Sequence, residues 1–232
     1  MVIMKTKSKQ SIIELRDIWK VYQIGDIKVE ALRGVSVSIK QGEFVAITGP
    51  SGSGKSTMMN MVGALDIPSK GAIYLDGKDI SKLHESDLAE IRGKKIGFVF
   101  QQFNLISTLS ALENVMLPME FQEAEDIEEK AKQALTIVGL NDRMNHKPKE
   151  LSGGQQQRVA IARAIANNPE VILADEPTGN LDSKTGKEIM ELFNKLHKEG
   201  KTVILITHDL NLVRYGERIV ILRDGKVSNE KM

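Results

Sequence analysis

The sequence predicts an α/β fold with a mostly parallel sheet, an antiparallel β portion near the N-terminus and an inserted helical subdomain. Three observations support this prediction. Short apolar runs alternate with helix-forming segments before residue 101 and after residue 167. Between them, residues 102–166 are rich in helix formers and contain no strand-like run. A glycine-rich loop also joins an apolar strand to a helix, as in α/β folds with anion sites at helix N-termini.

The first part of the chain is rich in strand signals. Residues 12–48 contain alternating or fully apolar runs, and a helix pattern follows the glycine-rich loop. The expected strands lie at residues 12–15, 34–39, 44–48, 72–75 and 95–100, and the expected helices at 55–63 and 85–92.

Helix patterns dominate the middle of the chain, and strand patterns return after it. The expected helices lie at 111–121, 127–138, 155–166 and 184–198, and the later strands at 171–174, 202–207 and 218–222. We therefore expect a single domain over residues 12–232. Its core would comprise 12–101 and 167–232, with 102–166 as the helical subdomain and 1–11 as a flexible N-terminus.

Composition excludes several classes of protein. The chain has 32 Lys and Arg against 31 Asp and Glu, so its charge is balanced. This balance gives no indication of a basic surface that would bind nucleic acid. The absence of cysteine excludes disulfides and thiolate sites. Residues 1–11 lack the apolar segment of a signal peptide, and no apolar run approaches the ~20 residues that span a bilayer. We expect a soluble chain whose membrane role comes through a partner.

Residues 49–57 form the strongest motif, because they match G-x-x-x-x-G-K-[ST] directly after an apolar strand. Glycines let the backbone curl and direct N–H groups at an anion. Lys55 adds positive charge, and the Ser56 hydroxyl can ligate Mg²⁺. A chance glycine-rich turn is the alternative, which the flanking strand and helix disfavour. The expected nucleotide-binding residues are Gly49, Pro50, Ser51, Gly52, Ser53, Gly54, Lys55, Ser56 and Thr57.

Two adjacent carboxylates follow the apolar run 171–174. Ligands of open α/β sheets bind at such strand ends. Successive side chains diverge, so we assign Asp175 to Mg²⁺ and Glu176 to the water that attacks the γ-phosphate. A pair of surface acids is the alternative, and the neighbouring phosphate motif disfavours it.

Residues 151–155, Leu-Ser-Gly-Gly-Gln, predict a second anion-binding helix N-terminus without a lysine. Standing alone, this segment would be read as an ordinary capped helix. Because the chain also has one complete phosphate site, we interpret this segment as half of a second nucleotide site. Head-to-tail pairing of two copies would bring it to the phosphate site of the other copy. The residues that a partner protomer would contribute are Ser152, Gly153, Gly154 and Gln155.

Single residues at strand ends add weaker signals. His208 follows the strand at 202–207 and could sense the γ-phosphate, although position alone favours a plain loop residue. Gln101, at the start of the helical segment, could reach Mg²⁺ or the attacking water. Either Trp19 or Tyr22 could stack on adenine, and both could equally be packing residues.

In this order the motifs resemble the ATP-binding-cassette (ABC) ATPases, the nucleotide-binding subunits of ABC transporters. The likeness extends over residues 12–227 and is most specific at 151–155. It implies ATP and Mg²⁺ as cofactors and a head-to-tail homodimer with two ATP molecules at the interface. It also implies an adenine-stacking role for Tyr22, a coupling role for Gln101, catalysis by Glu176 and His208, and a loop at the dimer interface formed by Asn180, Leu181 and Asp182.

Within this family, residues 95–106, 111–115 and 175–183 resemble the lipoprotein-release and macrolide-export branch. That resemblance implies integral membrane permease subunits as partners and a cytoplasmic location, peripheral on the inner face of the cell membrane. Ser107 and the acidic segment 122–127 depart from the branch pattern where a permease would dock.

Two alternatives to a transport role were weighed. The first uses the same ATPase in a cell-division complex that gates a cell-wall hydrolase. The second is a soluble ABC protein of DNA repair or translation. It is disfavoured because the chain has no coiled-coil insertion, second cassette or basic stripe.

Overall fold

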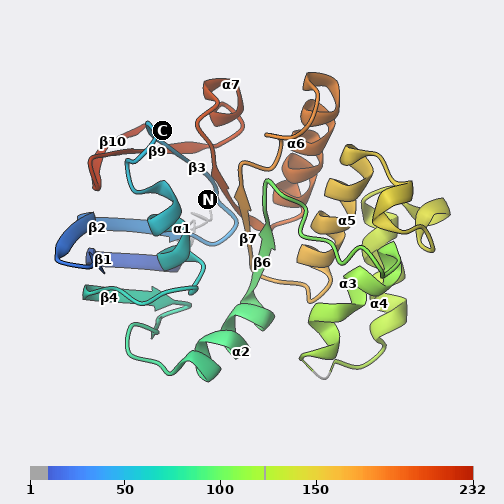
Figure 1. Cartoon of the computed structure of the whole chain (residues 1–232), viewed down its shortest axis with the longest axis horizontal. Helices are drawn as coiled ribbons and strands as arrows, with labels where there is room; N and C mark the ends of the chain where they lie inside the picture. Colours follow the sequence, from blue (N-terminus) through green and yellow to red (C-terminus); the bar gives the residue numbers. More distant parts are fainter. Residues whose placement is uncertain (1–9, 123, 232) are drawn as a thin grey trace, which may run out of the picture.

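The computed structural model describes residues 10–122 and 124–231. Two sheets and a helical layer are arranged side by side, with the helices α3, α4 and α5 at one end and the hairpin of β1 and β2 at the other (Figure 1). Residues 1–9 of the expected flexible N-terminus lie outside the described residues, and Ser11, the last residue of that segment, already begins β1.

The smaller sheet is antiparallel and has the strand order β2-β1-β4-β5. Its strands are β1 (Ser11–Ile24), β2 (Ile27–Lys40), β4 (Lys70–Leu75) and β5 (Lys78–Asp79). Both hairpin strands are longer than the alternating runs predicted, because pairing continues through residues 16–33 to a turn at Gly25 with a φ of 58°. Trp19 and Tyr22 therefore lie within β1.

The larger sheet has the order β10-β9-β3-β8-β7-β6 and is parallel except for the last hairpin, β9–β10. Its strands are β3 (Phe44–Thr48), β6 (Ile96–Val99), β7 (Val171–Asp175), β8 (Thr202–Ile206), β9 (Arg218–Arg223) and β10 (Lys226–Lys231). This mostly parallel sheet beside an antiparallel one confirms the predicted fold class.

Helices cover both faces of the larger sheet. They are α1 (Lys55–Val62), α2 (Glu85–Lys95), α3 (Ala111–Glu120), α4 (Ile127–Ile137), α5 (Gly153–Ile165), α6 (Ser183–Lys198) and α7 (Leu210–Val213), with short 3₁₀ turns at Asn141–Arg143 and Pro148–Glu150. Within the described residues, none of these helices combines the length and the apolar character needed to cross a membrane.

Alternation along the buried strands divides the core into two apolar clusters. In β8, Ile204 and Ile206 join the cluster beneath α1 and the antiparallel sheet. Val203 and Leu205, one residue out of step, join the cluster beneath α3, α5 and α6. Because side chains of a strand alternate between faces, a fully apolar strand supplies both cores, as expected for a parallel sheet covered on two sides.

Candidate functional site

The glycine-rich loop joins the end of β3 to the start of α1, and two of its glycines are required by close backbone approach. A Cβ at Gly49 would lie 2.2 Å from the carbonyl oxygen of Leu222. A Cβ at Gly54 would lie 2.6 Å from the carbonyl oxygen of Ala31, and its φ is 101°. Any side chain at either position would displace the loop from β2 or β9.

Two polar side chains of this loop differ in their accessibility to a ligand. The Lys55 Nζ donates to the carbonyl oxygens of Gly49, at 2.8 Å, and Pro50, at 3.0 Å, and so curls back over the loop. The hydroxyl of Ser53 is buried and has no hydrogen-bond partner among the described residues. Lys55 lines the cleft beside the loop and Ser53 does not, so the ammonium at the start of α1 is the group of the two that fits the oxygens of an anion.

A cleft of about 490 Å³ lies beside the loop. One wall comes from β2, and another from the turn between β9 and β10. Gly225 of that turn donates its N–H to the Ser53 carbonyl at 3.1 Å and accepts from the Arg33 N–H at 2.8 Å. The residues outside the phosphate loop that line the cleft are Val29, Glu30, Ala31, Arg33, Asp224 and Gly225.

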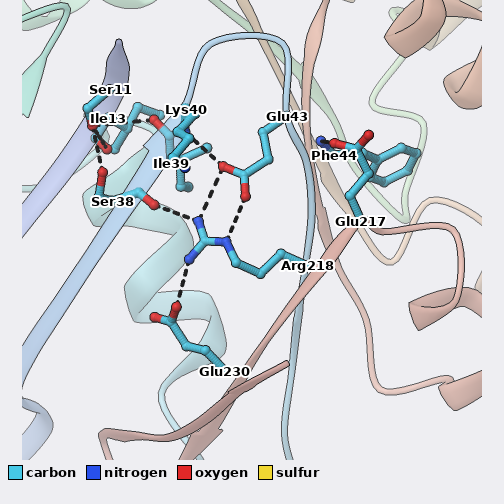
Figure 2. Close-up of polar contacts among 10 residues, drawn as sticks. All are labelled: Ser11, Ile13, Ser38, Ile39, Lys40, Glu43, Phe44, Glu217, Arg218 and Glu230. Atoms are coloured by element: carbon cyan, nitrogen blue, oxygen red, sulfur yellow. Dashed lines mark hydrogen bonds and ion pairs between the residues drawn. The ribbon is translucent and has the colours of Figure 1, made fainter. Parts of the chain in front are cut away.

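The β9–β10 hairpin is anchored by a partly buried arginine at its other end (Figure 2). The Arg218 guanidinium donates to Glu43 at 2.6 Å, to Glu230 at 2.8 Å and to the Ser38 carbonyl at 2.5 Å. One side chain thereby joins β2, the approach to β3, and β10. The sequence reasoning missed both β10 and this wall of the cleft, although the Asp-Gly pair at 224–225 is a hairpin-turn signal.

The two predicted carboxylates lie where β7 ends, and their environments differ. Burial raises the pKa of Asp175, the Glu176 carboxylate raises it further, and the charge of Lys55 opposes both effects. The Lys55 ammonium and the Asp175 carboxyl therefore interact electrostatically, and their assignment to one nucleotide site stays a prediction.

Glu176 is held by the end of the neighbouring strand. Its Oε1 accepts from the backbone N–H of His208 at 2.9 Å and lies 2.5 Å from the His208 ring Nδ1. Its Oε2 accepts from the Thr207 hydroxyl at 3.1 Å. The Glu176 side chain is 17% exposed and that of His208 is 74% exposed, so the histidine covers the carboxylate from the solvent side. The structure thus brings these two predicted residues into direct contact.

The segment after Glu176 reaches the predicted coupling glutamine. Gln101 and Asn180 are joined twice, through the Gln101 Nε2 and the Asn180 Oδ1 at 3.3 Å and through the Asn180 Nδ2 and the Gln101 carbonyl at 2.9 Å. Asp182 caps α6 by accepting from the Lys184 and Thr185 N–H groups. Hydrogen bonds from Thr185 lower the pKa of Asp182.

The second predicted anion site is a capped helix N-terminus. The Ser152 Oγ accepts from the Gln155 N–H at 3.3 Å, and the Gln155 side chain accepts from the Ser152 N–H at 2.9 Å. α5 begins at Gly153, two residues earlier than predicted, and a Cβ at Gly154 would lie 2.3 Å from the Thr185 methyl group. None of residues 152–155 lines the 490 Å³ cleft. Within this chain the two anion sites are separate.

The adenine-stacking assignment stays a prediction. The Tyr22 hydroxyl donates to Asp66 at 3.3 Å, and the Lys20 ammonium lies 5.1 Å from the Tyr22 ring centroid. The Trp19 Nε1 donates to Asp17 at 3.1 Å. Neither aromatic residue is among those that line the cleft beside the phosphate loop.

Comparison with known proteins places the chain in a family. Residues 32–179 match the family model described as ABC transporter. An uncharacterized ABC transporter ATP-binding protein of Thermotoga maritima is 55% identical over 220 residues, which are 94% of each chain. A macrolide export ATP-binding/permease protein, MacB, of Bdellovibrio bacteriovorus is 50% identical over 94% of this chain and 34% of its own length.

Solved structures give the same result. The ATP-binding cassette MJ0796, a Methanocaldococcus jannaschii protein, has a dimeric post-hydrolysis structure bound to ADP and Pi. This chain matches that structure with a TM-score of 0.86 and 52% identity, over 94% of this chain and 97% of the other. With more than half of its residues matched by the family model and a relative 55% identical along nearly its whole length, the chain belongs to the ABC transporter ATP-binding proteins and is an ATPase.

Proposed function

We propose that this ATPase closes as a head-to-tail homodimer over two molecules of Mg-ATP and drives a separate membrane permease of the lipoprotein-release or macrolide-export type. One observation carries the proposal. The chain has a glycine-rich loop whose lysine lines a cleft, and a second glycine-containing helix N-terminus at Ser152 that lines no part of the same cleft. Two copies facing each other would combine these halves into two complete sites.

Each residue of the first half has a role in hydrolysis. Lys55 and the loop N–H groups bind the phosphates and stabilise charge that develops during phosphoryl transfer. The Glu176 carboxylate orients the attacking water and accepts its proton. Because the His208 N–H and the Thr207 hydroxyl donate to this carboxylate, its orientation is fixed by the end of β8.

Ser56, Gln101 and Asp175 are the proposed ligands of the magnesium ion. A hydroxyl, an amide and a carboxylate are the oxygen donors that this cation prefers, together with phosphate oxygens. When bound, Mg²⁺ supplies positive charge that neutralises the β- and γ-phosphates. The Asp175 carboxyl fits this role, because the proximity of Glu176 and burial both disfavour its charge in the absence of a cation.

A permease has a suitable docking surface between the two lobes. A groove of about 880 Å³ lies where α2 and β6 of the core meet α3 and α5. Phe98, Phe100 and Pro118 line it, and Phe121, at its edge, is 82% exposed. An exposed phenylalanine beside an apolar groove is typical of a protein interface. The MacB relatives carry ATP-binding and permease functions in one longer chain, which supports a permease as the occupant.

Charge substitution in this groove tests the permease interaction. Phe121→Asp should abolish recovery of integral membrane subunits with the tagged ATPase from native membranes, because a carboxylate would be buried without a partner. The ATPase rate of the isolated chain should not change. Recovery would be measured by mass spectrometry of the isolated complex.

Ile137→Asp is the matched control, since Ile137 is also exposed on the helical lobe but lies outside this groove. It should leave recovery intact. Equal recovery of a permease with both variants would exclude the groove as its docking site. If no membrane protein is recovered with the parent chain, the proposed transport role is contradicted. The proposed location at the cytoplasmic membrane then also loses its support.

A further inference from the structure

A buried amide on α5 is bonded to two backbone segments of the site. Gln157 is fully buried, and its Nε2 donates to the carbonyl oxygens of Phe100, at 3.3 Å, and Pro177, at 2.7 Å. Phe100 directly precedes Gln101, and Pro177 directly follows Glu176. A single side chain therefore fixes the backbone beside both residues.

The rest of this side chain is explained poorly by stability. Among the described residues, the Gln157 Oε1 has no hydrogen-bond partner although it is buried. The unpaired buried oxygen costs free energy of folding, and the contribution of this side chain therefore comes from its nitrogen, which supplies a donor to two carbonyls. The amide is useful here because of the two hydrogen bonds that its nitrogen donates.

α5 is well placed to transmit motion. Its N-terminus carries the Ser152 cap, and its length packs against α3 and α4 of the helical lobe and against β6 and α6 of the core. Near its C-terminus, the Arg163 guanidinium donates to the carbonyls of Phe103 and Asn104, at 2.9 and 2.6 Å. The segment that follows β6 is thus attached to α5 at two points, on either side of Gln101.

We propose that Gln157 is a positioning residue of the ATPase, which couples the orientation of α5 to the placement of Gln101 and Glu176. Any rotation of α5 that brings Ser152 to a nucleotide then also moves the two backbone segments that Gln157 holds. The coupling rests on the roles proposed above for Gln101 and Glu176, and it does not depend on the identity of the permease.

The first test replaces the amide with an apolar side chain of similar length. Gln157→Met should lower kcat by on the order of tenfold or more, because misplacement of catalytic groups is costly even when small. The apparent KM for ATP should stay within about threefold of the parent value, since the phosphate loop is untouched. Val159→Ala, a buried change on the same helix, is the control for destabilisation, and thermal midpoints of both variants are measured.

A double-mutant cycle supplies the readout that a structural role would not produce. If Gln157 acts through Gln101, the variant with both Gln157→Met and Gln101→Ala should be about as slow as the slower single variant. Rate losses that multiply would overturn the coupling. So would a Gln157→Met kcat within about twofold of the parent, or an equal kcat loss in Val159→Ala at a similar thermal midpoint.

The cycle also separates this inference from the proposed function. If Gln101→Ala keeps the parent kcat, the proposed role of Gln101 fails, and the coupling fails with it. If Gln101→Ala is slow and Gln157→Met is not, the coupling alone is wrong.

Discussion

At the scale of single residues, Lys55 shows how a binding group is held before its ligand arrives. Its described hydrogen bonds go to two neutral carbonyls of its own loop, and none of the described ion pairs involves it. A phosphate is a stronger partner for an ammonium than a carbonyl, because the hydrogen bond is then charge-assisted on both sides. Binding of a phosphate by Lys55 would therefore replace two hydrogen bonds to neutral carbonyls with stronger, charge-assisted ones.

Removal of this ammonium should weaken nucleotide binding. Lys55→Ala is expected to weaken ATP affinity by at least about tenfold, since a hydrogen bond between charged groups contributes roughly 1.5–3 kcal/mol. Titration with a fluorescent ATP analogue measures the effect. Lys187→Ala, which removes an exposed lysine of α6, is the control and should bind like the parent. Retention of parental affinity by Lys55→Ala would refute the phosphate-loop assignment.

The Glu176 carboxylate can be neutralised with little disturbance of its surroundings. In Glu176→Gln the amide oxygen still accepts from His208, and the amide nitrogen can donate to the Thr207 hydroxyl, which accepts as readily as it donates. Turnover should fall by on the order of 10²-fold or more, because an amide accepts no proton from water. Steady-state phosphate release measures this. A variant that hydrolyses ATP at the parental rate would show that another group is the base.

At the scale of elements, the sequence predicted those strands that are apolar along their own length. β3, β7 and β8 are continuous apolar runs bounded by polar residues or glycine, because both of their faces are covered. β10 was missed because its residues are mostly exposed and polar. Its position depends on pairing with β9 and on the Glu230–Arg218 ion pair, neither of which leaves a local apolar pattern.

The same distinction applies to the site. Residues 49–57, Ser152 and Glu176 could be predicted because each motif is short and its chemistry follows from residue type and local geometry. The cleft wall formed by Ala31, Arg33 and Gly225 could not, because it arises where β2 and the β9–β10 turn meet through tertiary contacts.

The N-terminal cap of α3 allows a test of stability that does not change the ATPase site. The Ser110 Oγ accepts from the Glu113 N–H, and the Glu113 carboxylate accepts from the Ser110 N–H in return. Ser110→Ala should lower the free energy of unfolding by about 1 kcal/mol and the thermal midpoint by about 2–4 °C, with the ATPase rate unchanged. Ser86→Ala, at an exposed position in the first turn of α2, should lower stability by no more than about 0.5 kcal/mol. Equal midpoints for the two variants would show that the Ser110 cap contributes nothing.

At the scale of the whole molecule, one chain holds two unlike anion-binding helix N-termini. The first, at α1, has a lysine, an unpaired hydroxyl and an adjoining cleft. The second, at α5, has a capping box and an exposed Ser152, and it lines no part of that cleft. In the homodimer proposed above, a two-fold axis would place each α5 terminus opposite the α1 terminus of the other copy. The dimer would then contain two nucleotide sites, each formed by the α1 terminus of one copy and the α5 terminus of the other.

A bulky cation at the α5 terminus tests this arrangement. Ser152→Arg should leave ATP binding by the single chain nearly unchanged, because α1 and Lys55 are intact. It should prevent hydrolysis, since the arginine would occupy the space for the partner's γ-phosphate. We expect Glu176→Gln to accumulate an ATP-bound dimer because its turnover is slow, and Ser152→Arg added to that variant should prevent this dimer. Light scattering after size-exclusion chromatography, with Mg-ATP present, measures the dimer.

Two controls separate bulk and charge from loss of the cap. Ser152→Ala removes the hydrogen bond to the Gln155 N–H and adds no volume, so it should retain dimerisation and most of the ATPase rate. His84→Arg introduces the same side chain at the N-cap of α2 and should behave like the parent. If Ser152→Arg hydrolyses ATP as fast as His84→Arg, the γ-phosphate does not approach Ser152, and each chain must complete its site without the other.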